Sequence, residues 1–214
     1  MLTFSCPVNE QTELRLMDPS QAAELFALVE ANREVLRRWH PWVDELRSAE
    51  TVANVITHWR RLEANRQGWF AGLWFQGRLC GMINHQNLDW PNRWSALSYW
   101  LDTAHQGRGL MTAGCRALMA HSFNDWRLNR LTIACATANT RSRALAERLG
   151  FKLEGVVRSI EWLHDHYADH ALYGLLRCEF QPGGRPAEQP DSADSGPLPG
   201  PQSGGRMNLA GRFG

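Results

Sequence analysis

The chain has 214 residues, of which 43% are hydrophobic and 21% are charged, and its formal net charge is +1 at pH 7. These values are typical of a globular protein in water, and no apolar run reaches the length of a membrane-spanning helix. The arginines lie scattered among carboxylates rather than in a basic block, which argues against nucleic-acid binding. We therefore expect neither a membrane nor a nucleic acid as a partner.

Cysteine usage indicates the compartment. The cysteines are odd in number, widely spaced and without a Cys-x-x-Cys pair, which argues against a disulfide framework and against a zinc cluster. Residues 1–10 lack the basic stretch and apolar core of a secretory signal. We expect a cytoplasmic protein with no metal site.

Residues 181–214 differ in composition from the rest of the chain. They are rich in Pro, Gly, Ser and Asp and contain almost nothing that could form a core, so we expect them to be disordered. The prediction is one folded domain over residues 1–180 and a tail over residues 181–214. A dispensable extension is the simpler interpretation of the tail, and a partner-binding segment is the alternative.

Periodicity and capping residues predict alternating elements in the domain. Asp18-Pro19 is an N-cap followed by a proline in the first helical turn, and Gly150 is a typical C-terminal stop. The expected order is strand 13–16, helix 18–36, helix 48–66, strands 69–75, 79–85 and 94–101, helix 110–126, strand 130–136, helix 141–149, and strands 151–162 and 167–180. These elements predict an α/β (α+β) fold, with a mixed sheet and helices on both faces.

A glycine-rich segment joins the strand at 94–101 to the next helix. Residues 106–112 read Gln-Gly-Arg-Gly-Leu-Met-Thr. The first N–H groups of a helix have no intrahelical partner, so glycines that admit an anion close to the backbone make this position a candidate phosphate site. A plain turn explains the segment equally well when it is taken alone.

A second motif follows the strand at 130–136. It consists of Asn139-Thr140-Arg141-Ser142, with Leu149-Gly150-Phe151 closing the next helix. Together with Gln106-x-x-Gly109-x-Met111 it resembles the GCN5-related N-acetyltransferase (GNAT) superfamily. The residues 99–102, 148–155 and 39–43 resemble more narrowly its RimJ/RimL branch, the ribosomal-protein N-acetyltransferases.

The resemblance implies a GNAT-type, mostly antiparallel seven-stranded sheet and an acetyl-CoA site. The first motif would bind the pyrophosphate and the second would lie beside the pantetheine arm. The implied acetyl-CoA-binding residues are Trp100, Leu101, Asp102, Gln106, Gly107, Arg108, Gly109, Leu110, Met111, Thr112, Asn139 and Ser142.

The chain departs from the superfamily pattern at two positions. Met111 replaces the Gly or Ala that ends the phosphate motif, and Ala146 replaces a Tyr that protonates the leaving thiolate in many members. Ser142 is the implied substitute for that acid. Its alternative role is an N-terminal hydrogen bond in the helix that it begins.

The acceptor side of the site is less well defined. Asp89 is the first candidate for the base that takes the proton of the attacking amine, and an ordinary turn residue is the alternative. His85 is the second candidate, because imidazole titrates near neutral pH. Candidate substrate-binding residues are Trp39, Trp42, His85, Asp89 and Tyr167. Trp90 and Trp94 fall near the same predicted groove as Trp39 and Trp42, and His164 and His166 accompany Tyr167 in the predicted hairpin as weak candidates.

The predicted activity is transfer of acetyl from acetyl-CoA to a primary amine by direct attack through a tetrahedral intermediate. The N-terminal amine of a protein, a ribosomal protein in particular, is the first acceptor considered. A small amine or an aminoacyl-type antibiotic is the alternative, as is a CoA-binding module without catalysis. A homodimer is compatible with the long C-terminal strands, which would otherwise leave an exposed sheet edge.

Overall fold

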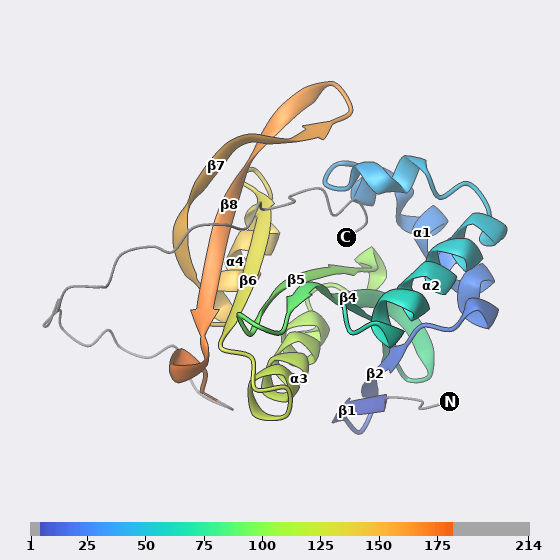
Figure 1. The fold of residues 1–214 in the computed structure, drawn as a ribbon. Helices are drawn as coiled ribbons and strands as arrows, with labels where there is room; N and C mark the ends of the chain where they lie inside the picture. Colours follow the sequence, from blue (N-terminus) through green and yellow to red (C-terminus); the bar gives the residue numbers. More distant parts are fainter. Residues whose placement is uncertain (1–4, 182–214) are drawn as a thin grey trace, which may run out of the picture.

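A computed structural model describes residues 5–181 and shows a twisted sheet with helices against both of its faces (Figure 1). The predicted tail, apart from residue 181, lies outside the described residues. The helices are α1 (Ala22–Arg37), α2 (Ala49–Ala64), α3 (Leu110–Asn124) and α4 (Thr140–Arg148). The strands are β1 (Ser5–Asn9), β2 (Thr12–Leu16), β3 (Trp69–Phe75), β4 (Arg78–Asp89), β5 (Trp94–Leu101), β6 (Arg130–Ala136), β7 (Lys152–Leu163) and β8 (His166–Leu176).

The predicted helix starts are confirmed, and side-chain caps explain them. Asp18 caps a 3-10 turn at Pro19–Gln21, which runs directly into α1, and it forms a reciprocal capping box with Gln21. Ser48 accepts a hydrogen bond from Thr51 N at 3.1 Å and so begins α2. These side chains satisfy N–H groups that the first helical turn leaves unpaired.

The sheet has eight strands in the order β1-β2-β3-β4-β5-β6-β8-β7, and all neighbours are antiparallel except β5 and β6. The expected number of seven is therefore wrong by one strand. The extra strand is β1, which pairs with β2 and carries Pro7 together with a register irregularity. A five-residue strand that contains a proline and an irregular ladder has no clear periodic signal in the sequence.

The parallel pair β5 and β6 separates after three residues. Trp94–Ala96 pair with Arg130–Thr132, and the ladder continues no further, although both strands do. Beyond these pairs the two strands leave a gap between them, which we call the wedge. Helix α3 follows β5 and helix α4 follows β6, so both helix N-termini lie at the open end of the wedge. A separated pair of strands leaves main-chain groups on the facing edges available for a ligand.

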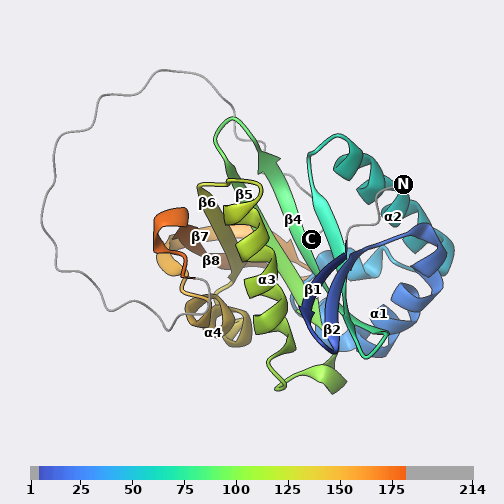
Figure 2. The same ribbon diagram turned by 90° about the horizontal axis from the view of Figure 1, so that it is seen from below.

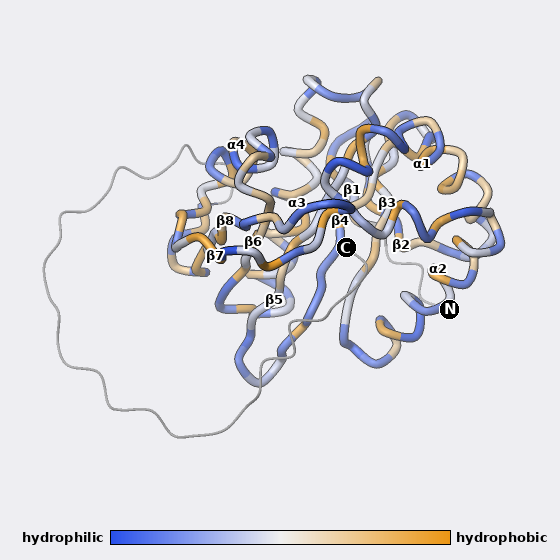
Figure 3. Tube along the Cα trace, turned by 90° about the horizontal axis from the view of Figure 1, so that it is seen from above, coloured by the Kyte–Doolittle hydropathy of each residue, from blue (hydrophilic) through white to orange (hydrophobic). Residues whose placement is uncertain are grey.

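Two hydrophobic clusters fill the two faces of the sheet. One lies under α3 and α4 and includes Phe123, Ile133 and Tyr173, and the other lies under α1 and α2 and includes Ile56 and Trp100. Figure 2 shows α3 and α4 on one side of the sheet and α1 and α2 on the other. The tube in Figure 3 is mostly blue over α4, in agreement with a short helix that buries only Leu145 and Ala146. The expectation of helices on both faces is confirmed.

The hairpin of β7 and β8 extends beyond the rest of the sheet toward the end of α1 (Figure 1). Its outer strand β7 is an edge strand, and most of its residues are exposed. None of the helices in the described part of the chain is long and apolar enough to cross a membrane.

Gly81→Ala is expected to destabilise the fold, because a Cβ at this position in β4 would lie 2.4 Å from the backbone oxygen of Trp100. Relieving such a contact requires a shift between β4 and β5, with a cost of about 1–3 kcal/mol in the free energy of unfolding. Urea unfolding measures the loss. Gly155→Ala in β7 is the matched control, since a Cβ there meets nothing within 4 Å, and it is expected to change stability by less than about 0.5 kcal/mol. Equal stability of the two variants would contradict the packing described here.

Candidate active site

The glycine-rich turn has the backbone geometry of an anion site. Gly107 and Gly109 have φ values of 77° and 74°, a left-handed conformation that favours glycine. Gly109 is the N-cap of α3 and offers no side-chain cap, so the first N–H groups of the helix have no capping side chain. Met111 is 7% exposed and packs in the hydrophobic cluster on the α3 side of the sheet. The departure at Met111 therefore does not obstruct the turn.

A buried asparagine anchors the loop before this turn. Asn32 of α1 donates to Asp102 Oδ1 at 2.9 Å and accepts from Thr103 N at 3.0 Å. His105 contacts the other oxygen of Asp102 at 2.7 Å. Desolvation raises the pKa of Asp102, but the hydrogen bonds from Asn32 and His105 outweigh it and hold this pKa below its usual value. Asp102 thus serves to shape the loop, and Asn32 is a contributor that the sequence alone did not reveal.

The two sequence motifs meet in space. Gln106 accepts a hydrogen bond from Arg141 at the start of α4, and Arg148 lies 3.4 Å from the hydroxyl of Thr112 in α3. Asn139 caps α4 by accepting from Ser142 N at 3.1 Å. Arginines therefore flank two helix N-termini, and both features attract an anionic ligand.

Ser142 is linked to the opposite strand of the wedge by Tyr99. The Tyr99 hydroxyl lies 3.1 Å from Ser142 Oγ and donates to Ser142 O at 3.2 Å. Burial raises the pKa of Tyr99 strongly, so the phenol stays protonated at neutral pH. Tyr99 of β5 thus reaches α4 and holds the seryl hydroxyl by a contact that does not depend on the helix cap.

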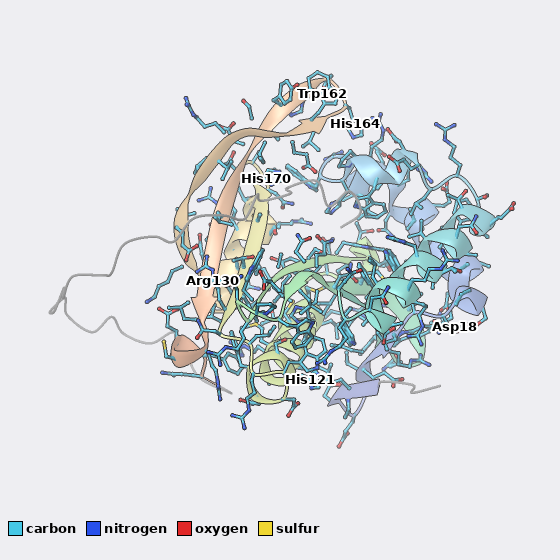
Figure 4. The ribbon with its side chains drawn as sticks, in the orientation of Figure 1. Asp18, His121, Arg130, Trp162, His164 and His170 are labelled. Carbon is cyan, nitrogen blue, oxygen red and sulfur yellow. The ribbon has the colours of Figure 1, made fainter. Side chains whose placement is uncertain are left out.

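A groove of about 1040 Å³ runs between the end of α1, the end of β6 and the β7–β8 hairpin. Its floor includes the small residues Ala136 and Ala138, and its walls include Trp39 and Tyr167. The structure thus brings together two of the predicted acceptor residues from distant parts of the chain. His164 and His166 line the same groove at the hairpin tip, and His164 is labelled there in Figure 4.

The tip of the hairpin is tied to the end of α1. His164 Nε2 contacts Arg37 O at 2.6 Å, and His164 Nδ1 lies 3.3 Å from Asp44. Arg37 also binds Asp44 with a shortest distance of 2.8 Å. The groove is therefore bridged at one end by polar contacts between segments that are more than a hundred residues apart in sequence.

Asp89 lies away from this groove. It ends β4 next to Trp94, which pairs with β6, so it marks the closed end of the wedge. Its carboxylate accepts from Asn92 N at 2.9 Å, from Asn92 Nδ2 at 2.8 Å and from Trp94 Nε1 at 3.2 Å. Hydrogen bonds from Asn92 lower its pKa, which weakens it as a base. The geometry favours the turn role of Asp89.

His85 is 0% exposed and lies in the core between the sheet and α3. Its ring nitrogens lie 3.0 Å from Ser95 Oγ and 2.7 Å from Ser122 Oγ. Burial lowers its pKa to about 3, so the ring is neutral at neutral pH. No atom of this imidazole reaches the groove surface, and we do not retain His85 as an acceptor residue.

A carboxylate and a histidine that were not predicted lie near the groove floor. Glu161 of β7 binds His170 of β8 at 3.0 Å, and His170 pairs in register with Ala136, which lines the groove. Figure 4 shows His170 midway along β8, below the hairpin tip. Glu161 and His170 also influence the imidazole of His40, whose pKa desolvation lowers to about 4. The pairing of β7 with β8 shifts register between Val157 and Glu161. Because of this shift, the alternation of side chains along β7 does not predict that Glu161 points toward His170.

Within residues 5–181, no group of three or more His, Cys, Asp and Glu side chains is placed to hold a metal ion.

Comparison with known proteins agrees with this geometry. Residues 11–152 match the Acetyltransferase (GNAT) domain. The candidate ribosomal N-acetyltransferase YdaF of Bacillus subtilis (strain 168) is 38% identical over 179 residues, which cover 83% of this chain and 98% of that protein. The ribosomal-protein-serine acetyltransferase of Escherichia coli (strain K12) is 28% identical, covering 82% and 98% of the two chains. A RimL structure, an L7/L12 α-N-protein acetyltransferase in complex with coenzyme A, superimposes with a TM-score of 0.79 at 28% identity, covering 81% and 98%.

The chain belongs to the GNAT family and is an acetyl-CoA-dependent N-acetyltransferase. Within the family it is a member of the RimJ/RimL-like branch, to which these ribosomal-protein acetyltransferases belong.

Proposed function

We propose that this enzyme acetylates the α-amine at the N-terminus of a protein, with a ribosomal protein as the first acceptor to test. The observation that carries this proposal is the groove of about 1040 Å³ beside the wedge. A groove of this size with two aromatic walls, Trp39 and Tyr167, suits an extended peptide end better than a small free amine. The relatives that are named for ribosomal proteins support the same acceptor class.

Acetyl-CoA supplies the acetyl thioester, and its pyrophosphate is the anionic group that residues of this chain are suited to bind. The N–H groups that follow Gly109, with Arg141 and Arg148 close by, form the proposed pyrophosphate site. The unpaired edge of β5 beyond Ala96 offers backbone N–H groups where negative charge would develop on the thioester oxygen.

The Glu161 and His170 pair is the proposed route for the proton of the acceptor amine. An ammonium group is no nucleophile, so a base must take its proton directly or through water. Glu161 is paired with a histidine beside the groove floor, whereas Asp89 is held by its own turn. Attack by the neutral amine then proceeds through a tetrahedral intermediate.

Ser142 is the proposed donor of a proton to the departing thiolate. The single hydrogen of the Tyr99 hydroxyl can be donated to Ser142 Oγ in place of Ser142 O, and the seryl hydrogen is then free to point elsewhere. Ser142 and Tyr99 together thus take the proposed role of the Tyr that many GNAT members have at the position of Ala146.

The proposed function is tested by mixing the protein with acetyl-CoA and a panel of ribosomal-protein N-terminal peptides and small amines, and by following free thiol and intact mass. The expected result is acetylated peptide at a rate well above background. Faster turnover of small amines than of every peptide would move the assignment to a small-molecule acetylase. Binding of acetyl-CoA with no thiol release on any acceptor would contradict catalysis.

Glu161→Gln is expected to lower kcat/KM for the peptide about 100-fold, the usual contribution of a positioned base. Asp89→Asn is the matched variant, because it also neutralises one carboxylate, and we expect kcat/KM within about threefold of the wild type since Asp89 lies in a turn. Steady-state kinetics on both variants decides between the two carboxylates. A larger loss of kcat/KM in Asp89→Asn than in Glu161→Gln would indicate that Asp89 is the base.

Tyr99→Phe is expected to lower kcat about tenfold while leaving the KM for acetyl-CoA unchanged, because the lost hydrogen bond orients a reacting hydroxyl rather than binding the donor. Ser142→Ala lowers kcat at least as much. The double variant is expected to match Ser142→Ala, since Tyr99 acts through Ser142. Fully additive losses would show that the two residues act separately.

A further inference from the structure

The tip of the β7–β8 hairpin stands outside the sheet. The pairing of β8 with β6 ends at His170 and Ala136, so residues 161–168 form a ribbon whose two strands pair only with each other in the described part of the chain. The register of β7 and β8 also shifts between Val157 and Glu161, where this ribbon begins. A ribbon of two strands is only marginally stable on its own in water. The position of the tip therefore depends on its contacts with the rest of the domain.

One of these contacts is apolar. Leu163 and Ala168 are buried with Ala136 in a small hydrophobic cluster. Trp39, just after α1, packs against this cluster, whereas Trp42 packs against the cluster under α1 and α2. Trp39 thus links the hairpin to the end of α1.

The other contact is polar, and His164 at the tip makes it with both ring nitrogens (Figure 4). Nε2 lies 2.6 Å from Arg37 O, and a carbonyl oxygen can only accept, so Nε2 carries a hydrogen. Nδ1 lies 3.3 Å from the carboxylate of Asp44, which the guanidinium of Arg37 also binds. Hydrogen bonds from Arg37 lower the pKa of Asp44, so the carboxylate is ionised at neutral pH. We call the contacts of His164 with Arg37 and Asp44 the clasp.

The clasp joins the two walls of the groove. Residues 163–169 of the hairpin line one side, and Glu34 and residues 37–39 at the end of α1 line the other. An extended peptide in the groove lies between these walls, and their separation at this end is fixed where His164 meets Arg37.

The proposed base is held independently of the clasp. Glu161 binds His170 at 3.0 Å, and His170 pairs in register with Ala136 of β6. Glu161 is thus anchored to the sheet where the ribbon begins. Loss of the clasp should therefore disturb acceptor binding rather than proton removal.

We propose that His164 is a positioning residue for the acceptor. Its contacts with Arg37 O and Asp44 hold the hairpin wall against the end of α1, and they thereby set the width of the groove for an extended peptide. The inference rests on the proposed peptide N-acetyltransferase function, and it adds a residue that acts on the acceptor through the groove wall.

Steady-state kinetics of the full-length His164→Asn variant tests the proposal. His164 has a φ of 58°, a left-handed conformation that asparagine also adopts readily, so the turn is preserved while the shorter side chain cannot reach both acceptors. The KM for a peptide acceptor is expected to rise about tenfold, the effect of losing a hydrogen bond to a charged group. We expect kcat and the KM for acetyl-CoA to stay within about twofold of the wild type, because the reacting groups are not displaced.

His166→Asn is the matched control. His166 lines the same groove from the same hairpin, but its ring binds the neighbouring Asp165 at 2.6 Å, within the hairpin. Its peptide KM is expected to stay within about twofold of the wild type. Equal rises in the two variants, or no rise in His164→Asn, would overturn the proposal.

A double-mutant cycle locates the effect in the clasp. Asp44→Asn weakens the contact with Nδ1 of His164 from the opposite side, and it is also expected to raise the peptide KM. In the double variant the rise is expected to be smaller than the product of the two single rises, because the same contact is removed twice. Rises that multiply in full would show that the two residues act separately, which contradicts the clasp.

Hydrogen exchange separates this inference from the proposed function, because it needs no acceptor. The amides of residues 160–168 are expected to exchange about tenfold faster in His164→Asn than in the wild type, and at the wild-type rate in His166→Asn. Faster exchange supports the clasp even if no peptide is acetylated. Unchanged exchange in His164→Asn rejects the clasp even if peptides are acetylated.

Calorimetry of peptide binding in the presence of coenzyme A then tests the role in positioning without turnover. Weaker binding to His164→Asn than to His166→Asn supports that role. Equal affinities of the two variants for the peptide reject it.

Discussion

The separation of β5 from β6 is the constraint on which the rest of this structure depends. Three residue pairs hold the two parallel strands at one end, and beyond them each strand must find partners on its other side only. β5 pairs with β4 and β6 pairs with β8, so the two halves of the sheet are each cohesive while the seam between them is open. An open seam leaves backbone groups unsatisfied, and a ligand that lies along it supplies what a neighbouring strand would otherwise provide.

Side chains on both sides of this seam therefore hold the two halves of the sheet together. Side-chain contacts cross it where the strand ladder has ended, among them Tyr99 to Ser142 and Gln106 to Arg141. The loop that leads to the glycine-rich turn is fastened by Asn32, which comes from the helix layer of the opposite face. Helix α1, which covers one half of the sheet, therefore helps to fix the proposed pyrophosphate site of the other half.

Capping residues and short sequence motifs predicted much of this fold. Asp18, Ser48 and Gly150 mark helix ends that the structure confirms, and the two spaced motifs identify the family. The acceptor side was less accessible to sequence reasoning. The burial of His85 depends on Ser95 and Ser122, which come from a different strand and from α3, and the direction of Glu161 depends on a slipped ladder. Such facts belong to tertiary pairing, and no local pattern encodes them.

The buried imidazole of His85 has a consequence for the whole fold. A neutral imidazole has one N–H, so one of the two seryl hydroxyls accepts from the ring and can donate to a backbone carbonyl, either Ser122 to Leu118 O at 2.6 Å or Ser95 to Gln86 O at 2.8 Å, while the other hydroxyl donates to the second ring nitrogen. An unfolded histidine takes up a proton near pH 6.5, whereas the folded one does so only at about pH 3. Stability from this group is therefore present above pH 6.5 and falls as the pH decreases toward 3, by at most about 1.4 kcal/mol per pH unit. Since His85 packs against α3, whose N-terminus carries the proposed pyrophosphate site, acidification is expected to weaken the packing that supports this proposed site.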